Sequence, residues 1–192
     1  MNFKDFKKLV CNTRTTRRFK KDITIENIEL EDVLDAARVV SSAKNMQPLK
    51  YITVTDKNLV KKLAQTCQWA THLENWNQKE EEQPSAFIIV LNDTKIDGFA
   101  MLDCGIALNN IMLGLKIKGY SSCPLASIDK ELCKELFSLD EKIEPMIGIA
   151  IGIEDETIKV VDVKLDTNYY RDEIDIHCVP KRDLNDVLIG KY

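Results

Sequence analysis

Two clusters of basic residues carry the side chains of this sequence that are best suited to binding an anion. Near the N-terminus, arginines alternate with hydroxyl-bearing residues in the run Arg14, Thr15, Thr16, Arg17 and Arg18. Near the C-terminus, Lys181 and Arg182 are adjacent. Guanidinium groups beside hydroxyls supply positive charge and short hydrogen-bond donors together, which suits a phosphate monoester. A solvated surface patch is the alternative for either cluster taken alone.

The sequence has no glycine-rich loop that would cradle such a phosphate. It contains only seven glycines, none of them clustered, and it lacks both the P-loop and the dinucleotide-binding pattern G-x-G-x-x-G. The hydrolase patterns G-x-S-x-G and H-E-x-x-H are missing as well. An anionic ligand would therefore be held by side chains.

The segment from Ser41 to Pro48, S-S-A-K-N-M-Q-P, is a second candidate ligand-binding stretch. Its small side chains would let a planar ligand approach the backbone closely. Asn45 would offer both donors and acceptors to the edge of a heterocycle. The alternative is a simple connection between a helix and a strand.

Cysteines and histidines give weaker indications of chemistry. The six cysteines are far apart and form no C-x-x-C pair, so we expect small buried residues in a reduced protein. A single nucleophilic cysteine is the alternative. His72 and His177 are too few and too separated to indicate a metal site or a catalytic cluster, and each is expected to be a surface or hydrogen-bonded structural residue.

Length and charge define the class of protein that carries these groups. The 192 residues fit a single domain, 1–192. Lys and Arg total 27 against 31 Asp and Glu, a net charge of −4, which argues against a dedicated nucleic-acid binder. No apolar run approaches the roughly 20 residues of a membrane helix, and the charged N-terminal segment shows no secretory signal. We therefore expect a soluble, cytoplasmic protein.

Hydrophobic periodicity predicts helices packed around buried strands. Apolar residues at helical spacing predict an amphipathic helix over 2–11 and a second helix that Thr24 would cap. Alternation over 49–55 and a continuous apolar run over 86–91 predict strands, the second buried on both faces. One or two helices are expected over 58–76, and single helices over 97–118 and 130–137. Further strands are expected over 120–123 and 145–153. The sum is an α+β fold.

Two segments would be incomplete on their own. Between Phe99 and Ile117 the expected helix has few polar positions, and a helix that is apolar nearly all round has to be covered on all sides. It is therefore either the central helix of the domain or a helix that packs against a second subunit. The tail from Tyr169 to Tyr192 is too polar to form a core alone.

Several motifs follow one another along nearly the whole chain. The first two are T-R-T-T-R-R-F from Thr13 and S-S-A-K-N-M-Q-P-L from Ser41. Further along come D-C-G-I-A-L-N-N-I-M-L, K-G-Y-S-S-C-P-L-A-S, I-G-I-A-I-G and Y-Y-R-D-E…H-C-V-P-K-R-D-L. In this order they resemble the flavin-dependent nitroreductase family, whose usual first motifs are R-R-S-x-R-x-F and P-S-A-x-N-x-Q-P-W. A subgroup, mostly of unassigned substrate, also has W-A-x-x-L-x-x-W followed by E-x-P-S-A, matched here from Trp69 to Ala86.

The resemblance implies a nitroreductase-like α+β fold with a mixed, mostly antiparallel sheet wrapped by helices. It also implies an obligate homodimer with a swapped C-terminal tail, which binds FMN in two sites at the subunit interface. The FMN-binding residues that it implies are Arg14, Thr15 and Arg17 at the phosphate and the pyrimidine side, Lys181 and Arg182 at the phosphate, Ser41, Ser42, Ala43 and Asn45 from the second subunit, and Pro124, Leu125, Ala126 and Ser127 along the isoalloxazine.

The implied activity is that of an FMN-dependent NAD(P)H oxidoreductase with a ping-pong mechanism. NAD(P)H would pass a hydride to the flavin and leave, and a nitroaromatic, a quinone or a similar electron-poor molecule would then be reduced at the same site. The cofactor carries the chemistry, so no catalytic side chain is required, and Arg17 would stabilise the charge of the reduced flavin. The alternatives are a non-catalytic flavin-binding or sensory module and a structural protein that has lost the cofactor.

This sequence departs from the family pattern at a few positions. Thr13 stands where many members have a first arginine, and Ser41 replaces a proline. Leu49 replaces the common aromatic, and the loop 124–127 lacks a glycine that is often found there. We expect these changes to affect the choice of substrate more than the binding of flavin.

Overall fold

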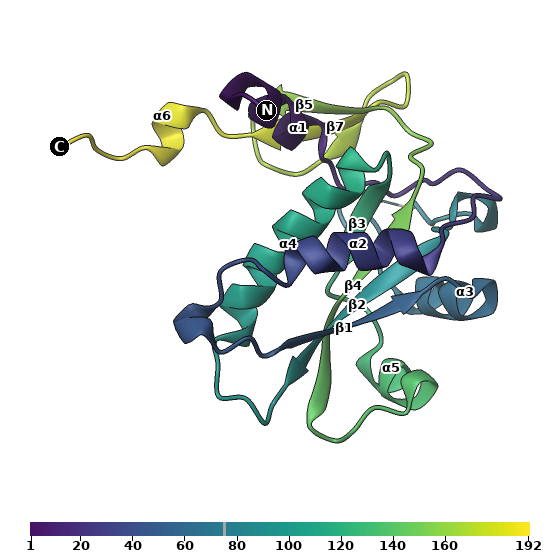
Figure 1. Ribbon diagram of the computed structural model, residues 1–192. Helices are drawn as coiled ribbons and strands as arrows, with labels where there is room; N and C mark the ends of the chain where they lie inside the picture. The colour runs from purple at the N-terminus through teal and green to yellow at the C-terminus, as the bar shows by residue number, and fades with distance from the viewer. Residues whose placement is uncertain (75) are drawn as a thin grey trace.

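Two β-sheets form the framework of the computed structural model, which describes residues 1–74 and 76–192 (Figure 1). The larger sheet is antiparallel throughout, with its strands in the order β1-β2-β4-β3. These strands are β1 (Leu49–Val54), β2 (Ala86–Asp93), β3 (Ser121–Leu125) and β4 (Ile143–Gly152). In the smaller sheet, β5 (Ile158–Asp162) runs parallel to β7 (His177–Lys181), and β6 (Tyr170–Arg171) pairs antiparallel with β7.

The alternation of side chains along β2 divides the core into two layers. Phe87 and Ile89 belong to a cluster that includes residues of α3 (Lys57–Thr66) and α5 (Lys130–Phe137). Ile88 and Val90 belong to the opposite cluster, which includes residues of two other helices, α2 (Asn27–Ala37) and α4 (Ala100–Ile117). Successive side chains of a strand point to opposite faces, so each pair of helices covers one face of the sheet. The predicted α+β fold is confirmed.

The segment from Thr15 to Lys20 follows the edge of the larger sheet. The Thr16 amide donates to the carbonyl of Ser122 at 3.0 Å, and the Lys20 amide donates to that of Ile153 at 2.8 Å. Between them the Phe19 ring lies over Gly152, where an added Cβ would come within 2.7 Å of Phe19 Cδ1. The glycine therefore permits the close approach that fixes the N-terminal basic residues beside the sheet.

Helix α4 is apolar as predicted, but its own chain leaves one face open. Met101, Leu102 and Ile117 are exposed, and 28% of the helix is buried. With 18 residues and a mean hydropathy of 1.3, it is long and apolar enough to cross a membrane by length and composition alone. This corrects the expectation that no apolar run approaches that length, although core helices pass the same test. Helix α4 packs against α2 and β3.

The two ends of the chain also expose apolar side chains. Helix α1 (Phe3–Asn12) matches the amphipathic helix predicted over 2–11 and begins with a capping box between Asn2 and Asp5. None of its residues is buried, and Phe3 is 78% exposed. Helix α6 (Leu184–Val187) and the last residues extend away from the rest of the chain (Figure 1).

Two local predictions were wrong. The helix expected over 58–76 ends at Thr66, because Cys67 is extended. The Trp69 indole donates to the carbonyl of Ala64 at 3.0 Å, which occupies an acceptor at the end of the helix. Position 75 of the expected range lies outside the described residues. Thr24 does not cap α2. Glu26 stands at the N-cap position, without a side-chain hydrogen bond.

Candidate functional site

A cavity of about 750 Å³ lies between the N-terminal segment, helix α4 and the smaller sheet. Its volume is in the range of roughly 300–1,000 Å³ that is typical of cofactor and ligand pockets. The described residues that line it include four cations and no aspartate or glutamate; the cations are Arg14, Arg17, Lys181 and Arg182. The structure therefore brings the two basic clusters, which lie far apart in the sequence, to one cavity that is suited to an anion.

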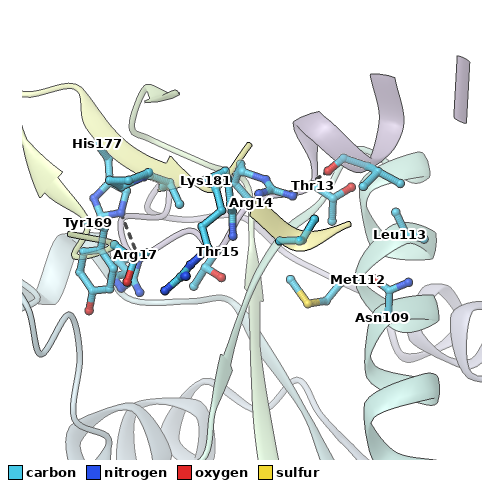
Figure 2. A pocket seen from close by; sticks show the side chains of 16 residues that line it. Thr13, Arg14, Thr15, Arg17, Asn109, Met112, Leu113, Tyr169, His177 and Lys181 are labelled. Carbon is cyan, nitrogen blue, oxygen red and sulfur yellow. Dashed lines mark hydrogen bonds between the residues drawn. The ribbon is translucent and has the colours of Figure 1, made fainter. Parts of the chain in front are cut away.

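The other walls of this cavity are apolar. Met112 and Leu113 of α4 face the basic residues across the cavity (Figure 2), and Val10, Val179 and Pro180 are further apolar lining residues. Asn109 adds an amide on the same side of α4. The cavity thus suits a ligand that joins an anionic group to a large apolar one.

Arg14 is held by the C-terminal end of α1. Its Nη2 donates to the carbonyl of Val10 at 2.7 Å, and the neighbouring Thr13 hydroxyl donates to the carbonyl of Leu9 at 2.8 Å. The Nε of Arg14 is buried and has no hydrogen-bond partner among the described residues. A buried donor without a partner is costly, so a ligand oxygen would improve the energy of this site. Arg14 lies beside Thr15 and Lys181 in Figure 2.

Arg17 is held by two rings at the other end of the cavity (Figure 2). Its guanidinium carbon lies 4.2 Å from the centroid of the Tyr169 ring, a cation–π contact. Its Nη1 lies 3.3 Å from His177 Nε2. The ring centroids of Tyr169 and His177 lie 5.2 Å apart. The His72 ring contacts the Tyr169 ring edge to face, with 4.8 Å between their centroids.

Glu156, the carboxylate that contacts the backbone of Arg17, is already engaged. Glu156 is 1% exposed in its side chain and forms an ion pair with Arg171. It also accepts hydrogen bonds from the backbone amides of Arg17 and Arg18. Within the residues that the structure describes, the Arg17 guanidinium forms no ion pair. Arg17 therefore keeps its full positive charge toward the cavity.

His177 is buried and neutral at physiological pH. Burial lowers its pKa to about 4; the charge of Glu156 opposes this change, and the guanidinium groups of Arg17, Arg171 and Arg18 add to it. The expectation of a hydrogen-bonded structural histidine is thus met in part, since the ring also lines the cavity.

Arg18 is separated from the other two arginines of its cluster. Its Nε lies 3.2 Å from a Glu82 carboxylate oxygen, and its Nη1 pairs with Asp175. It does not line the cavity. Successive side chains of an extended segment point to opposite sides, so Arg17 and Arg18 face different environments.

The predicted residues from Ser41 to Asn45 lie at the opposite end of α4 from the cavity. Ser41 and Ser42 line a smaller cavity of about 190 Å³ with Asp103. The amide of Ala43 donates to Asp103 at 2.9 Å, and Asn45 is exposed. Within one chain they are not brought to the basic cavity, and their contact with flavin from a second subunit stays a prediction.

The predicted residues from Pro124 to Ser127 do not line the basic cavity either. Pro124 and Leu125 end strand β3, and Leu125 is buried. Ala126 is exposed, and the Ser127 hydroxyl accepts a hydrogen bond from the Gln68 amide at 3.0 Å. Their position along the isoalloxazine stays a prediction.

Three residues around Arg17 were not predicted as site residues from the sequence. Tyr169, His177 and Glu156 surround it in the structure. Tyr169 and His177 stand in the motif Y-Y-R-D-E…H-C-V-P-K-R-D-L, but the family resemblance assigns neither of them to the ligand site.

The cysteines are free and largely buried, as expected. Cys104, Cys123, Cys133 and Cys178 are buried, whereas Cys11 is exposed. Burial raises the pKa of Cys123 to about 12 and that of Cys133 to about 11. Thiols with such pKa values stay protonated and unreactive near neutral pH, which disfavours the nucleophilic alternative for these two.

The fold is that of nitroreductases. An FMN-dependent nitroreductase of Clostridium difficile R20291 superimposes with a TM-score of 0.65 at 22% identity, over 79% of this chain and 88% of that one. The chain belongs to the nitroreductase family, whose family model matches residues 10–153. The resemblance inferred from the sequence motifs is confirmed.

Two relatives show how the chain compares with named proteins. It is 28% identical over 148 residues to a provisionally named NADH dehydrogenase/NAD(P)H nitroreductase of Archaeoglobus fulgidus, covering 73% of this chain and 80% of the relative. It is 23% identical to the oxygen-insensitive NADPH nitroreductase of Helicobacter acinonychis, covering 83% of this chain and 93% of the relative.

Proposed function

We propose that this protein is an FMN-dependent NAD(P)H oxidoreductase that reduces nitroaromatic, quinone or similar electron-poor organic molecules. One observation carries the proposal: a single cavity combines four cations, no acidic lining residue among those described, and an apolar wall on α4. FMN joins a phosphate to a flat, largely apolar ring system, so each part of it has a matching wall. The names of the family relatives support a nicotinamide as the electron donor.

The residues of the cavity have separate roles in this proposal. Arg14, Lys181 and Arg182 hold the phosphate through charge-assisted hydrogen bonds, and the unpartnered Nε of Arg14 is one such donor. Thr15 adds a hydroxyl beside them. Arg17 presents its charge to the pyrimidine side of the ring. The bound flavin supplies the hydride chemistry, and the donor and the acceptor use the same cavity in turn.

A homodimer completes the site in this proposal. The exposed apolar face of α4, the unburied helix α1 and the extended tail around α6 support it, since each would gain cover from a second copy. The partner would supply the loop from Ser41 to Asn45, and the C-terminal tails would be exchanged. Large exposed apolar faces of this kind mark interaction sites.

Purified protein tests the activity directly. We expect a yellow protein whose flavin absorbance is bleached by NADH or NADPH without oxygen and restored by a nitroaromatic or a quinone. A yellow protein that neither donor bleaches would indicate the non-catalytic flavin-binding module instead. A colourless protein that ignores added FMN would indicate a structural protein without cofactor.

A further inference from the structure

Three arginines lie around Glu156, and among the described residues two of them are paired with carboxylates. Arg171 pairs with Glu156 itself, and Arg18 pairs with Glu82 and Asp175. Arg17 is instead held by the Tyr169 face at 4.2 Å and by His177 Nε2 at 3.3 Å. Both are neutral groups. They fix the direction of the guanidinium without offsetting its charge.

The contact between Arg17 and His177 specifies one form of the imidazole. A guanidinium only donates hydrogen bonds, so Nε2 has to accept and the ring proton has to be on Nδ1. An imidazolium would donate from both nitrogens and would repel the guanidinium. The Nδ1 atom is buried and has no partner among the described residues, so the N–H of this form is an unpaired donor, and the hydrogen bond from Arg17 to Nε2 has to outweigh that cost.

The charged groups that face His177 favour the neutral ring. Arg17, Arg171 and Arg18 disfavour a further positive charge, and among the described residues Glu156 is the one acidic group that favours it. Glu156 is already engaged by Arg171 and by two backbone amides. The ring itself is fully buried, which also disfavours its charged form.

We propose that His177 is a positioning residue for Arg17: as a neutral hydrogen-bond acceptor, and with the Tyr169 ring as a platform, it aims the guanidinium into the cavity and leaves its charge available to an anionic ligand edge. A carboxylate in the same place would give the same direction but would cancel the charge. The identity of the ligand edge, the pyrimidine side of FMN, rests on the proposed function. The positioning of Arg17 does not.

The ring state is tested first, without any ligand. Histidine labelled with ¹⁵N reports the tautomer of His177 by NMR, with His72→Gln to assign the two signals. We expect a neutral Nδ1–H ring at pH 7 that loses its fixed tautomer in Arg17→Gln. A ring with its proton on Nε2, or a tautomer that Arg17→Gln leaves unchanged, would overturn the proposal. This result holds whether or not the protein binds FMN.

Flavin affinity then tests what the orientation achieves. Three substitutions separate hydrogen bonding from charge: His177→Gln keeps a neutral acceptor, His177→Leu removes it, and His177→Glu keeps an acceptor but adds a negative charge. We expect FMN and riboflavin to bind the glutamine variant within a few-fold of wild type. We expect both to bind the leucine and glutamate variants roughly ten- to a hundredfold more weakly. A purely structural role predicts instead that affinity follows the melting temperatures of the variants.

A double-mutant cycle removes the remaining ambiguity. In the Arg17→Gln background, His177→Leu should change flavin affinity little, because the cation that it positions is gone. Equal losses in both backgrounds, or a glutamate variant that binds as well as the glutamine variant, would refute the role of His177. A wild-type protein that binds neither flavin would refute the proposed function, and the NMR result would still decide the positioning.

Discussion

Ser42 Oγ lies 2.5 Å from a carboxylate oxygen of the buried Asp103 and donates a hydrogen bond to it. The same carboxylate accepts the amide of Ala43 at 2.9 Å, and Ser42 Oγ accepts the amide of Gln47 at 2.9 Å. The loop from Ser42 to Gln47 has three non-glycine residues with φ between 53° and 56°, namely Lys44, Asn45 and Gln47. Such conformations are strained and persist only where the surroundings hold them. Asp103 thus holds the loop that is predicted to reach the flavin of a second subunit.

Replacing this carboxylate should loosen the loop. In Asp103→Asn an NH₂ group replaces one carboxylate oxygen and cannot accept a hydrogen bond. One of the two bonds, from the Ser42 hydroxyl or from the Ala43 amide, is therefore lost. We expect the free energy of unfolding to fall by about 1–3 kcal/mol, measured by urea denaturation. Asp97→Asn, an exposed aspartate before α4, is the control and should change stability little. Equal stability of the two variants would show that Asp103 does not hold the loop.

The low pKa of His177 predicts how stability depends on pH. In the folded protein the pKa of His177 is about 4, against the ordinary histidine value of 6.5. Above pH 6.5 the ring is neutral in both the folded and the unfolded state, and the contribution of His177 to stability is fully present. As the pH falls below 6.5, the histidine of the unfolded chain binds a proton that the folded protein does not. The free energy of unfolding should therefore drop between pH 6.5 and 4, by up to about 3 kcal/mol.

The variant His177→Gln isolates this contribution. It lacks the titrating ring but keeps the carboxylates whose protonation also destabilises the protein in acid. The difference in the free energy of unfolding between wild type and variant therefore reports His177 alone. Urea unfolding at several pH values between 4 and 7 measures it. A difference that stays constant with pH would mean that the ring titrates alike in the folded and unfolded chains.

Some of this architecture follows from local sequence and some does not. The apolar run of β2 predicts a strand buried on both faces, and the structure divides its side chains between two clusters. The pairing of Arg17 with His177 spans 160 positions, so no local pattern contains it. The separation of Arg17 from Arg18 depends on the extended backbone along β3, which the basic run alone does not specify. Helix propensity also failed beyond Thr66, where a tertiary hydrogen bond from Trp69 competes with the helix.

The exposed face of α4 predicts that the chain is a dimer. Met101 and Leu102 are exposed and apolar at the start of this helix. We expect wild type to sediment as a dimer at micromolar concentration, with an interface above the roughly 2,000 Å² of obligate homodimers. The double variant Met101→Lys and Leu102→Lys should be monomeric and should lose most of its FMN, because the second subunit supplies part of the site.

A matched substitution elsewhere controls for added charge. Gln65 is exposed on α3, which packs on the opposite face of the sheet, and Gln65→Lys should leave both the dimer and the flavin unaffected. A wild-type monomer that retains FMN at micromolar concentration would contradict the dimeric site.

The phosphate end of the cavity differs from the Arg17 end in the ligand group that it should recognise. Arg14 approaches from the N-terminal segment and has an unpartnered buried Nε. Arg182 approaches from the end of β7 and is exposed. In the described residues neither of them forms an ion pair with a carboxylate. Both are therefore available to a doubly charged phosphate.

Removing either arginine should weaken FMN binding without weakening riboflavin binding. Hydrogen bonds to charged groups contribute about 1.5–3 kcal/mol each, so Arg14→Gln or Arg182→Gln should raise the dissociation constant of FMN by roughly ten- to a hundredfold. Riboflavin lacks the phosphate, so its weaker binding should change little. Titration of apo-protein followed by flavin fluorescence measures both ligands, with Lys62→Gln on the exposed face of α3 as the control. Equal losses for FMN and riboflavin would indicate a folding defect, and no loss for FMN would show that the two clusters are surface charge only.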